Sequence, residues 1–183
     1  MSGNPIMKNP WLDLPNHPPF VLREDLPFIS VHNEYYRRPE TWWINLCHTP
    51  EPRLGPVTAP VIILQLNPSY SHNEIDGKDY NDVLKQLSSI RDESHDHLGV
   101  VSPNNWWTPR LSQLMCRLEP NLLARRLCSI EFFPYRSRNF NHSQLRLPSQ
   151  EYTFSLVRNG LERKALFIVT RNIKLWVSAI PEL

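Results

Sequence analysis

Three continuous apolar runs along the chain are typical of buried strands. Residues 59–66 read Ala-Pro-Val-Ile-Ile-Leu-Gln-Leu, residues 127–133 read Leu-Cys-Ser-Ile-Glu-Phe-Phe, and residues 165–170 read Ala-Leu-Phe-Ile-Val-Thr. Apolar runs without alternation are typical of strands that are covered on both faces, as in a parallel sheet. We therefore expect strands over Val61–Leu66, Ser129–Phe133 and Leu166–Thr170.

The segments between these runs have helical patterns. They cover residues 79–91, residues 108–117 with more helix up to 124, and residues 149–163, where apolar positions recur at helical spacing. A shorter helix is expected over residues 23–36, and residues 50–60 are expected to form a loop. Strand, crossover helix and strand in this order predict a three-layer α/β/α sandwich with a mainly parallel central sheet.

The start of the chain differs from the rest. Prolines at positions 5, 10, 15, 18 and 19 predict that residues 1–20 form an irregular arm, which Trp11, Leu12 and Leu14 fasten to the domain. The 183 residues are enough for one domain, which we place at residues 21–183. No apolar run approaches the roughly 18–20 residues of a membrane span, and the first residues lack a signal-peptide pattern. We expect a cytoplasmic protein without a membrane partner.

A polar motif follows each predicted strand. The motifs are Asn67-Pro68-Ser69-Tyr70, Pro134-Tyr135-Arg136-Ser137-Arg138-Asn139 and Arg171-Asn172. The carboxyl ends of parallel strands meet at one edge of a sheet, and ligands of such sheets bind there. The sequence therefore predicts a binding site at that edge.

The charges are unevenly distributed along the chain. Residues 1–100 carry 8 Lys and Arg against 13 Asp and Glu, whereas residues 101–183 carry 12 against 5, and 15 of the 20 basic residues are arginine. Arginine suits phosphate and base edges, so an anionic partner is one interpretation, and a solvated basic face is the other. No G-x-G-x-x-G, P-loop or G-x-S-x-G pattern occurs, which argues against dinucleotide, nucleoside triphosphate and serine-hydrolase sites.

Cysteine and histidine positions give little sign of a metal or cofactor. The three cysteines form no C-x-x-C pair, and we expect them to be reduced and mostly buried. The acidic segment with Asp92, His95, Asp96 and His97 is expected to be a surface loop rather than a metal site. We therefore expect no metal, iron–sulfur cluster or other cofactor.

The first strand and its motif resemble a known family. A buried strand leading into Leu66-Asn67-Pro68-Ser69-Tyr70 is similar to the water-activating loop of the uracil-DNA glycosylase superfamily, where members carry G-x-D-P-Y, G-x-N-P-G or G-E-A-P-G. Trp106 and Trp107 stand just before a helix, as does the base-stacking aromatic of the family. The second strand with its polar loop and the third strand with its helix follow in the family's order. The resemblance covers roughly residues 20–183 and is strongest to a little-characterised bacterial group.

This resemblance implies roles for individual residues. Asn67 would orient the water that attacks the sugar, and arginines would contact the DNA backbone, namely Arg136, Arg138 and Arg146. The base pocket would be formed by Pro68, Ser69, Tyr70, Trp106, Trp107, Tyr135 and Asn139. Other interpretations stay open: Asn67 as a turn residue, one tryptophan as core, and Asn139 as a loop cap. Glu131 is expected either to pair with an arginine or to act as a catalytic carboxylate.

The function that the resemblance implies is that of a DNA glycosylase. It would hydrolyse the N-glycosidic bond of a deaminated or modified base, such as uracil or a modified cytosine, in DNA repair or phage defence. Two features depart from the family: Gln65 replaces a usual glycine, and the family's last motif, an H-P-S or N-P-S segment after a fourth strand, is absent from the sequence, which ends at Pro181-Glu182-Leu183. We therefore expect either a chain truncated at its C-terminus or the alternative function, a catalytically inactive nucleic-acid-binding or protein-interaction module that retains the fold.

Overall fold

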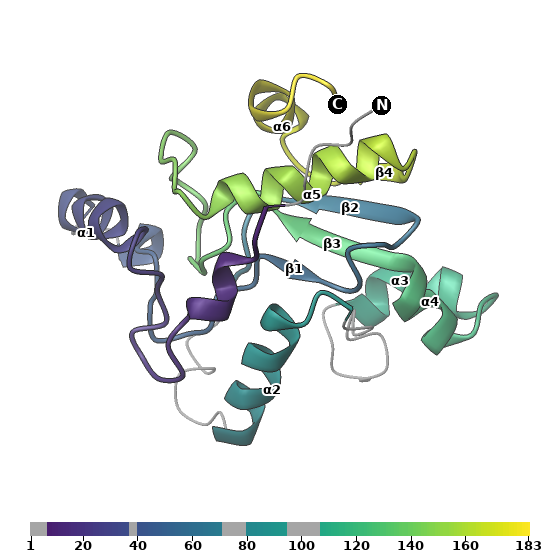
Figure 1. Cartoon of the computed structure of the whole chain (residues 1–183), viewed down its shortest axis with the longest axis horizontal. Coiled ribbons are helices and arrows are strands. Elements are labelled where there is room, and N and C mark those ends of the chain that lie inside the picture. Colours follow the sequence, from purple (N-terminus) through teal and green to yellow (C-terminus); the bar gives the residue numbers. More distant parts are fainter. Residues whose placement is uncertain (1–6, 37–39, 71–79, 95–106) are drawn as a thin grey trace.

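The computed structural model describes residues 7–36, 40–70, 80–94 and 107–183. These residues form a mixed α/β structure around one four-stranded sheet (Figure 1). The strands are β1 (Arg53–Leu54), β2 (Val61–Gln65), β3 (Leu127–Glu131) and β4 (Leu166–Val169). The helices are α1 (Leu26–Tyr35), α2 (Tyr80–Arg91), α3 (Trp107–Met115), α4 (Pro120–Arg126), α5 (Gln150–Glu162) and α6 (Ile173–Ala179), with short 3-10 turns η1 (Pro10–Asp13) and η2 (Glu40–Trp42).

The strand order in the sheet is β1-β3-β2-β4. β2 lies between β3 and β4 and is parallel to both, which confirms that the three apolar runs form strands. The predicted bounds of the second strand, Ser129–Phe133, were two residues too late, because β3 covers Leu127–Glu131. β1 pairs with β3 in the antiparallel direction, so the sheet is mixed, and part of the predicted loop over residues 50–60 is a strand. Sequence patterning missed β1 because two residues are too few to show any alternation.

Alternating side chains of the strands pack into two apolar clusters on opposite faces of the sheet. Ile62, Leu64 and Ile130 belong to the larger cluster, together with buried side chains of α5 and Trp176 of α6. Ile63 and Leu127 belong to the smaller cluster, which they form with α3 and α4. Figure 1 shows α5 across one side of the sheet and α3 and α4 on the other. The predicted α/β layering is confirmed at this level.

The N-terminal arm is anchored by two of the three predicted residues. Trp11 is fully buried and Leu14 is 3% exposed, whereas Leu12 is 49% exposed and was wrongly expected to anchor the arm. The turn η1 rotates Leu12 outward while its neighbours point toward the core.

The cysteine prediction is also corrected: all three are free, but only Cys128 is buried.

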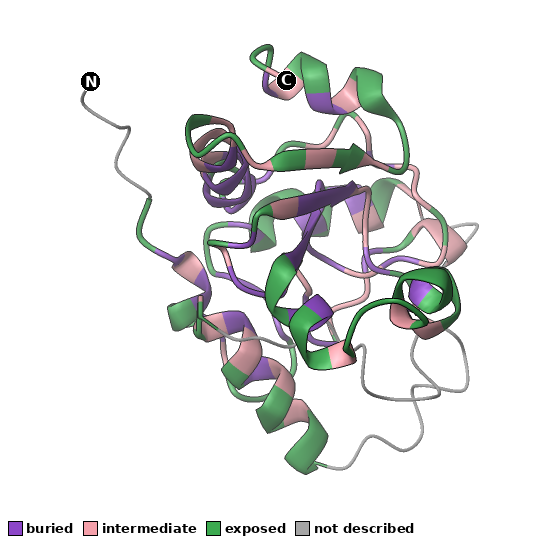
Figure 2. Cartoon of the chain, turned by 90° about the vertical axis from the view of Figure 1, so that its right-hand side faces the viewer, coloured by how far each residue is buried: buried purple, intermediate pink, exposed green. Residues whose placement is uncertain are grey.

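Strand β4 leaves one edge of the sheet unpaired within the described part of the chain (Figure 2). Leu166 is 62% and Ile168 45% exposed. They lie on the sheet face that carries the smaller cluster, but this cluster does not extend as far as β4. The backbone N–H groups of Leu166 and Thr170 donate to β2 and its flank. The N–H and C=O groups of Phe167 and Val169 therefore point away from β2.

No helix of the described residues has the length and apolar character that crossing a membrane requires.

Candidate functional site

The loops that follow β2 and β3 run side by side at the carboxyl edge of the sheet. Phe133 N–H donates to Leu66 C=O at 2.7 Å, and Ser137 N–H donates to Pro68 C=O at 3.3 Å. These bonds continue the strand pairing past the ends of both strands. The Asn67-Pro68-Ser69-Tyr70 motif and the Pro134 to Asn139 motif therefore lie together, as predicted from the topology.

Asn67 is held in a fixed orientation by its amide nitrogen. Its Nδ2 donates to the Ser137 Oγ at 2.9 Å, the Ser137 C=O at 3.3 Å and the Pro68 C=O at 3.1 Å. Ser137 is itself fully buried, so it forms a rigid partner. The Asn67 Oδ1 accepts no hydrogen bond from the residues that the structure describes, and the side chain is half-buried. One oriented acceptor is thus available at the edge of the sheet.

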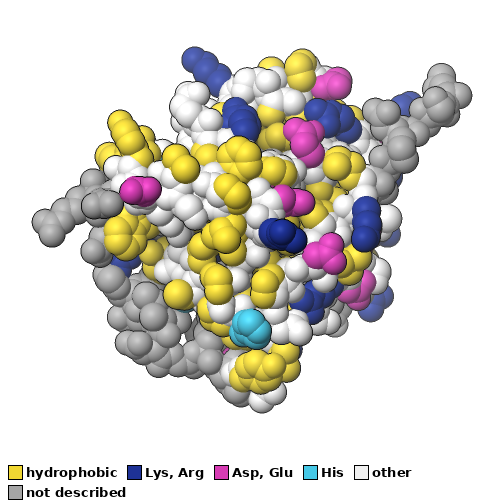
Figure 3. All heavy atoms as spheres, turned by 60° about the vertical axis from the view of Figure 1, so that its left-hand side comes forward, with side chains coloured by type: hydrophobic (Ala, Val, Ile, Leu, Met, Phe, Trp, Pro, Cys, Tyr) yellow, Lys and Arg dark blue, Asp and Glu magenta, His cyan; other side chains and the backbone are white. Residues whose placement is uncertain are grey.

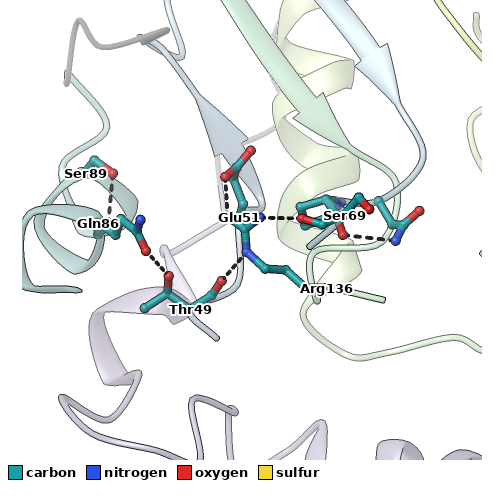
Figure 4. A network of polar contacts seen from close by, with 8 residues as sticks. Thr49, Glu51, Ser69, Gln86, Ser89 and Arg136 are labelled. Atoms are coloured by element: carbon teal, nitrogen blue, oxygen red, sulfur yellow. Dashed lines mark hydrogen bonds and ion pairs between the residues drawn. The ribbon is translucent and has the colours of Figure 1, made fainter. Parts of the chain in front are cut away.

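Arg136 ties the two loops to the segment that precedes β1 (Figure 4). Its guanidinium donates to the Ser69 C=O at 2.8 Å, to the Thr49 C=O at 3.0 Å and to the Glu51 Oε2 at 2.6 Å. The Arg136 side chain is 12% exposed. Because its donors are used within the protein, Arg136 positions the Ser69 backbone, and the prediction that it contacts a DNA phosphate is not supported by its surroundings.

Tyr70 lies between a histidine and an arginine. Its ring is 5.1 Å from the His48 ring, tilted by 37°, and the Arg138 guanidinium carbon lies 5.8 Å from the ring centroid. The Arg138 Nη2 is buried and has no hydrogen-bond partner among the described residues. Tyr70 and Arg138, both predicted from the sequence, therefore come together beside Asn67. The sequence analysis missed His48, because it is distant from both motifs in the sequence.

A row of three polar side chains crosses the sheet at the same edge, and we call it the polar row: Gln65, Ser129 and Glu131. Gln65 faces Glu131 in the parallel register, and its Nε2 donates to the Ser129 Oγ at 3.2 Å. The three side chains lie on the face where Ile63 and Leu127 pack against α3 and α4. They continue that apolar face toward the loop containing Asn67.

Glu131 is the least accessible charged group of the polar row. It is 5% exposed, and its Oε2 is buried without a hydrogen-bond partner in the described part of the chain. Burial raises the pKa of Glu131 well above its ordinary value, and the Glu51 carboxylate raises that pKa further. Arg136 and Arg171 lower it by a smaller amount. The surroundings of Glu131 therefore favour the neutral form of its carboxyl group. No ion pair joins Glu131 to an arginine among the described residues, and its role as a catalytic carboxylate stays a prediction.

Tyr135 is not part of this site. It is fully buried, and its hydroxyl donates to the Asp25 Oδ2 at 2.7 Å and accepts from the Leu22 N–H at 3.1 Å. Burial, with the nearby Asp25 charge, raises the pKa of Tyr135 well above its ordinary value. The prediction that Tyr135 lines a base pocket is wrong, because the chain after β3 turns this ring toward the N-terminal arm, where it contacts Trp11 edge-on at 5.7 Å.

The two predicted tryptophans have different outcomes. Trp107 begins α3, is 6% exposed and packs in the smaller cluster with Ile63 and Leu111. It thus lies on the same sheet face as the polar row, as a core residue rather than an open stacking surface. Trp106 lies outside the described residues.

Two further predicted residues have different positions. Arg146 lies in the next loop, where it donates to the Ser143 and Leu145 carbonyls, and its guanidinium carbon is 5.3 Å from the Phe132 ring centroid. Asn139 ends the motif after β3 and is exposed; its N–H donates to the Thr41 C=O at 2.9 Å, and its C=O accepts from the Ser137 Oγ at 3.1 Å. Arg146 therefore supports its own loop, and the Asn139 backbone links the loop after β3 to Thr41.

Arg171 is a basic residue at this edge that the sequence analysis did not select. It follows β4 directly, is exposed, and is close enough to Glu131 to lower its pKa. Its position directly after the third predicted strand was the signal that could have identified Arg171.

On the face shown in Figure 3, Lys and Arg side chains are interspersed with Asp and Glu and with large hydrophobic side chains, so that face has no continuous basic surface.

The described residues contain no group of three or more His, Cys, Asp or Glu side chains arranged to hold a metal ion. Comparisons with protein families, with curated proteins and with solved structures find no match to this chain.

Proposed function

We propose that the protein is a DNA glycosylase-like hydrolase that acts on a deaminated or modified base, with uracil or a modified cytosine as substrate. The observation that carries the proposal is Asn67, whose amide nitrogen is fixed by Ser137 while its Oδ1 has no partner among the described residues. A carbonyl oxygen in a fixed place can hold a water molecule for attack on C1′ of a flipped nucleotide. The uracil-DNA glycosylase-like fold is part of this proposal.

The groups beside Asn67 suit the other requirements of this chemistry. Tyr70 offers an aromatic ring for a base, and base–aromatic stacking contributes about 1–3 kcal/mol. Arg138 and Arg171 are the basic side chains at the edge whose guanidinium groups are not used as Arg136 is, so they are assigned to the phosphate backbone. Asn67 is not a strong base, and the reaction relies on orientation of the water rather than on its deprotonation.

The competing function is a nucleic-acid-binding or protein-interaction module without catalysis. Burial of Trp107 favours it, since a buried ring offers no stacking surface unless α3 moves. The two functions differ in one measurable property, which is the formation of abasic sites.

The test is strand cleavage after alkali treatment of oligonucleotides that carry a panel of bases, including uracil and phage-type modified cytosines. The wild-type protein should produce abasic sites at one of these bases. Asn67→Ala should lower the rate by about 10²-fold or more, as loss of a positioning contact does. Asn121→Ala is the matched control, because Asn121 is an exposed residue of α4.

Two outcomes would count against the enzyme. If no base of the panel is released, glycosylase activity is excluded for that panel, and retained DNA binding would favour the non-catalytic module. If Asn67→Ala cleaves as fast as Asn121→Ala, water is held elsewhere and Asn67 is only a turn residue.

A further inference from the structure

The polar row has more hydrogen-bonding capacity than the protein uses. The Ser129 Oγ accepts from Gln65, but its own hydrogen is donated to no described residue. The Gln65 Oε1 and the Glu131 Oε2 likewise have no described partner. Buried polar groups without partners are costly, by about 1–3 kcal/mol each. The Glu131 Oε2 is such a group, and it lies beside the unused hydrogen-bonding capacity of Gln65 and Ser129 on an otherwise apolar sheet face. This arrangement is typical of a surface that is completed by a ligand.

The charge of the polar row limits the kind of ligand. Gln65 and Ser129 are neutral, and burial, which raises the pKa of Glu131, favours the neutral form of its carboxyl group. The basic side chains nearest to Glu131 do not change this: Arg136 is paired with Glu51 at 2.6 Å, and Arg171 is exposed. A row without net charge suits an uncharged ligand that has hydrogen-bond donors and acceptors of its own.

We infer that Glu131, supported by Gln65 and Ser129, recognises the edge of an uncharged planar heterocycle on which a hydrogen-bond donor and an acceptor stand side by side. The inference rests on the proposed function, for which it names the group that selects the base. It assigns base selection to Glu131 instead of Asn139, which is exposed and lies outside the polar row.

The chemistry of a neutral carboxyl group fits such an edge. Its O–H donates while its C=O accepts, so both bonds form in one plane. The N3–H and O4 of uracil and the N3 and N4–H of cytosine each present the complementary pair. An ionised carboxylate only accepts, and it would lose one of the two bonds. Gln65 is half-buried, so the row is reached from the end where Asn67 lies.

The test uses small bases rather than DNA, so that it does not depend on catalysis. 1-Methyluracil and 1-methylcytosine keep the edge and carry a methyl group where the sugar is attached. 1,3-Dimethyluracil has the same ring, but both of its N–H groups are blocked. Binding is measured by NMR titration of the wild-type protein, and at least one 1-methyl base should bind about tenfold or more tightly than 1,3-dimethyluracil, the discrimination expected of a bidentate contact.

Variants assign the discrimination to Glu131. Glu131→Leu should abolish the difference between the blocked and unblocked bases, whereas Glu131→Gln should retain it, because an amide also presents a donor beside an acceptor. Glu151→Leu is the matched control, since Glu151 is exposed on α5. Ser129→Ala should weaken the discrimination partly, and NMR spectra of the free variants show whether each is folded.

The outcomes separate this inference from the proposed function. Discrimination that persists in folded Glu131→Leu, or binding of no base up to millimolar concentrations, overturns the role of Glu131. Cleavage of oligonucleotides by the wild type together with either result leaves the glycosylase proposal standing. Base discrimination that depends on Glu131 without any cleavage supports the inference and contradicts the catalytic function.

Discussion

Arg136 and Glu51 join two loops that are 85 residues apart, with the Arg136 Nη2 at 2.6 Å from the Glu51 Oε2. The same guanidinium also holds the backbone carbonyls of Ser69 and Thr49. One side chain therefore fixes the position of the Asn67-Pro68-Ser69-Tyr70 loop relative to the segment before β1. The geometry of the candidate site depends on this contact although Arg136 need not contact a ligand.

Arg136→Ala should lower the free energy of unfolding by about 3 kcal/mol, because it leaves Glu51 without its partner in a partly buried place. Urea denaturation measures the change. The exposed pair of Lys85 and Asp82 is the control, and Lys85→Ala should cost under about 1 kcal/mol. Equal effects of the two variants would show that Arg136 is not a structural brace.

Arg138 and Arg171 should carry the salt dependence of DNA binding. Each phosphate contact contributes a slope of about −0.9 in log K against log salt on duplex DNA, so replacing both by alanine should flatten the slope by nearly 2. Arg146→Ala is the control, because Arg146 donates to carbonyls of its own loop. Fluorescence anisotropy at several salt concentrations measures the slopes. A steeper loss for Arg146→Ala than for the double variant contradicts the assignment.

His142 should make the fold sensitive to acid. The ring is 2% exposed, both nitrogens lack partners among the described residues, and burial together with His32 lowers the pKa of His142 to about 3. Since the unfolded chain binds this proton near pH 6.5, stability is retained above that pH and is lost as the pH falls toward 3. The loss at pH 5 should be about 2 kcal/mol.

His142→Leu isolates this contribution from those of the other titrating groups. As the pH falls from 8 to 5, the free energy of unfolding of the variant should rise relative to that of the wild type by about 2 kcal/mol. Urea denaturation at each pH measures this difference. Parallel pH profiles for the two proteins would mean that His142 accepts its proton without cost, through a rearrangement of the Phe133 and Phe140 rings that surround it.

Gly55→Ala should destabilise the protein by about 2–4 kcal/mol. Gly55 has a φ of +92°, and an added Cβ would lie 2.2 Å from the Leu127 carbonyl oxygen, which is backbone and cannot turn aside. Gly160→Ala is the comparison, because there the closest atoms are the ends of the Ile62 and Phe167 side chains. Thermal unfolding should show the larger drop for Gly55→Ala, and the opposite order would contradict this reasoning.

The sequence predicted those parts of the fold that depend on local pattern. The apolar runs located β2, β3 and β4, and their parallel order predicted that the motif containing Asn67 lies at the same sheet edge as the motif after β3. It could not predict which way an aromatic ring turns at the end of a strand, so Tyr135 was assigned to the pocket although it faces Asp25. Nor does any local pattern connect Arg136 with Glu51, because their pairing depends on the tertiary structure.

The polar row is a second example of tertiary contacts that local sequence pattern does not predict. Glu131 stood out in the sequence as a charge within an apolar strand, which indicates a special environment but not its kind. Only the register with Gln65 and the bond from Gln65 to Ser129 show that the buried, unpartnered Glu131 Oε2 lies beside two further polar side chains. Arg171 was overlooked because the loop after β3 contains several arginines, and the DNA-backbone contacts were assigned to those arginines.

The open edge of β4 has a consequence for how the protein behaves at high concentration. Outward N–H and C=O groups at Phe167 and Val169, next to exposed Leu166 and Ile168, are a template for strand pairing between molecules. The exposed Lys164 and Arg171, which flank β4 in the sequence, oppose such pairing by repulsion. Aggregation of the purified protein should therefore increase with ionic strength, as screening removes the repulsion while the apolar edge remains.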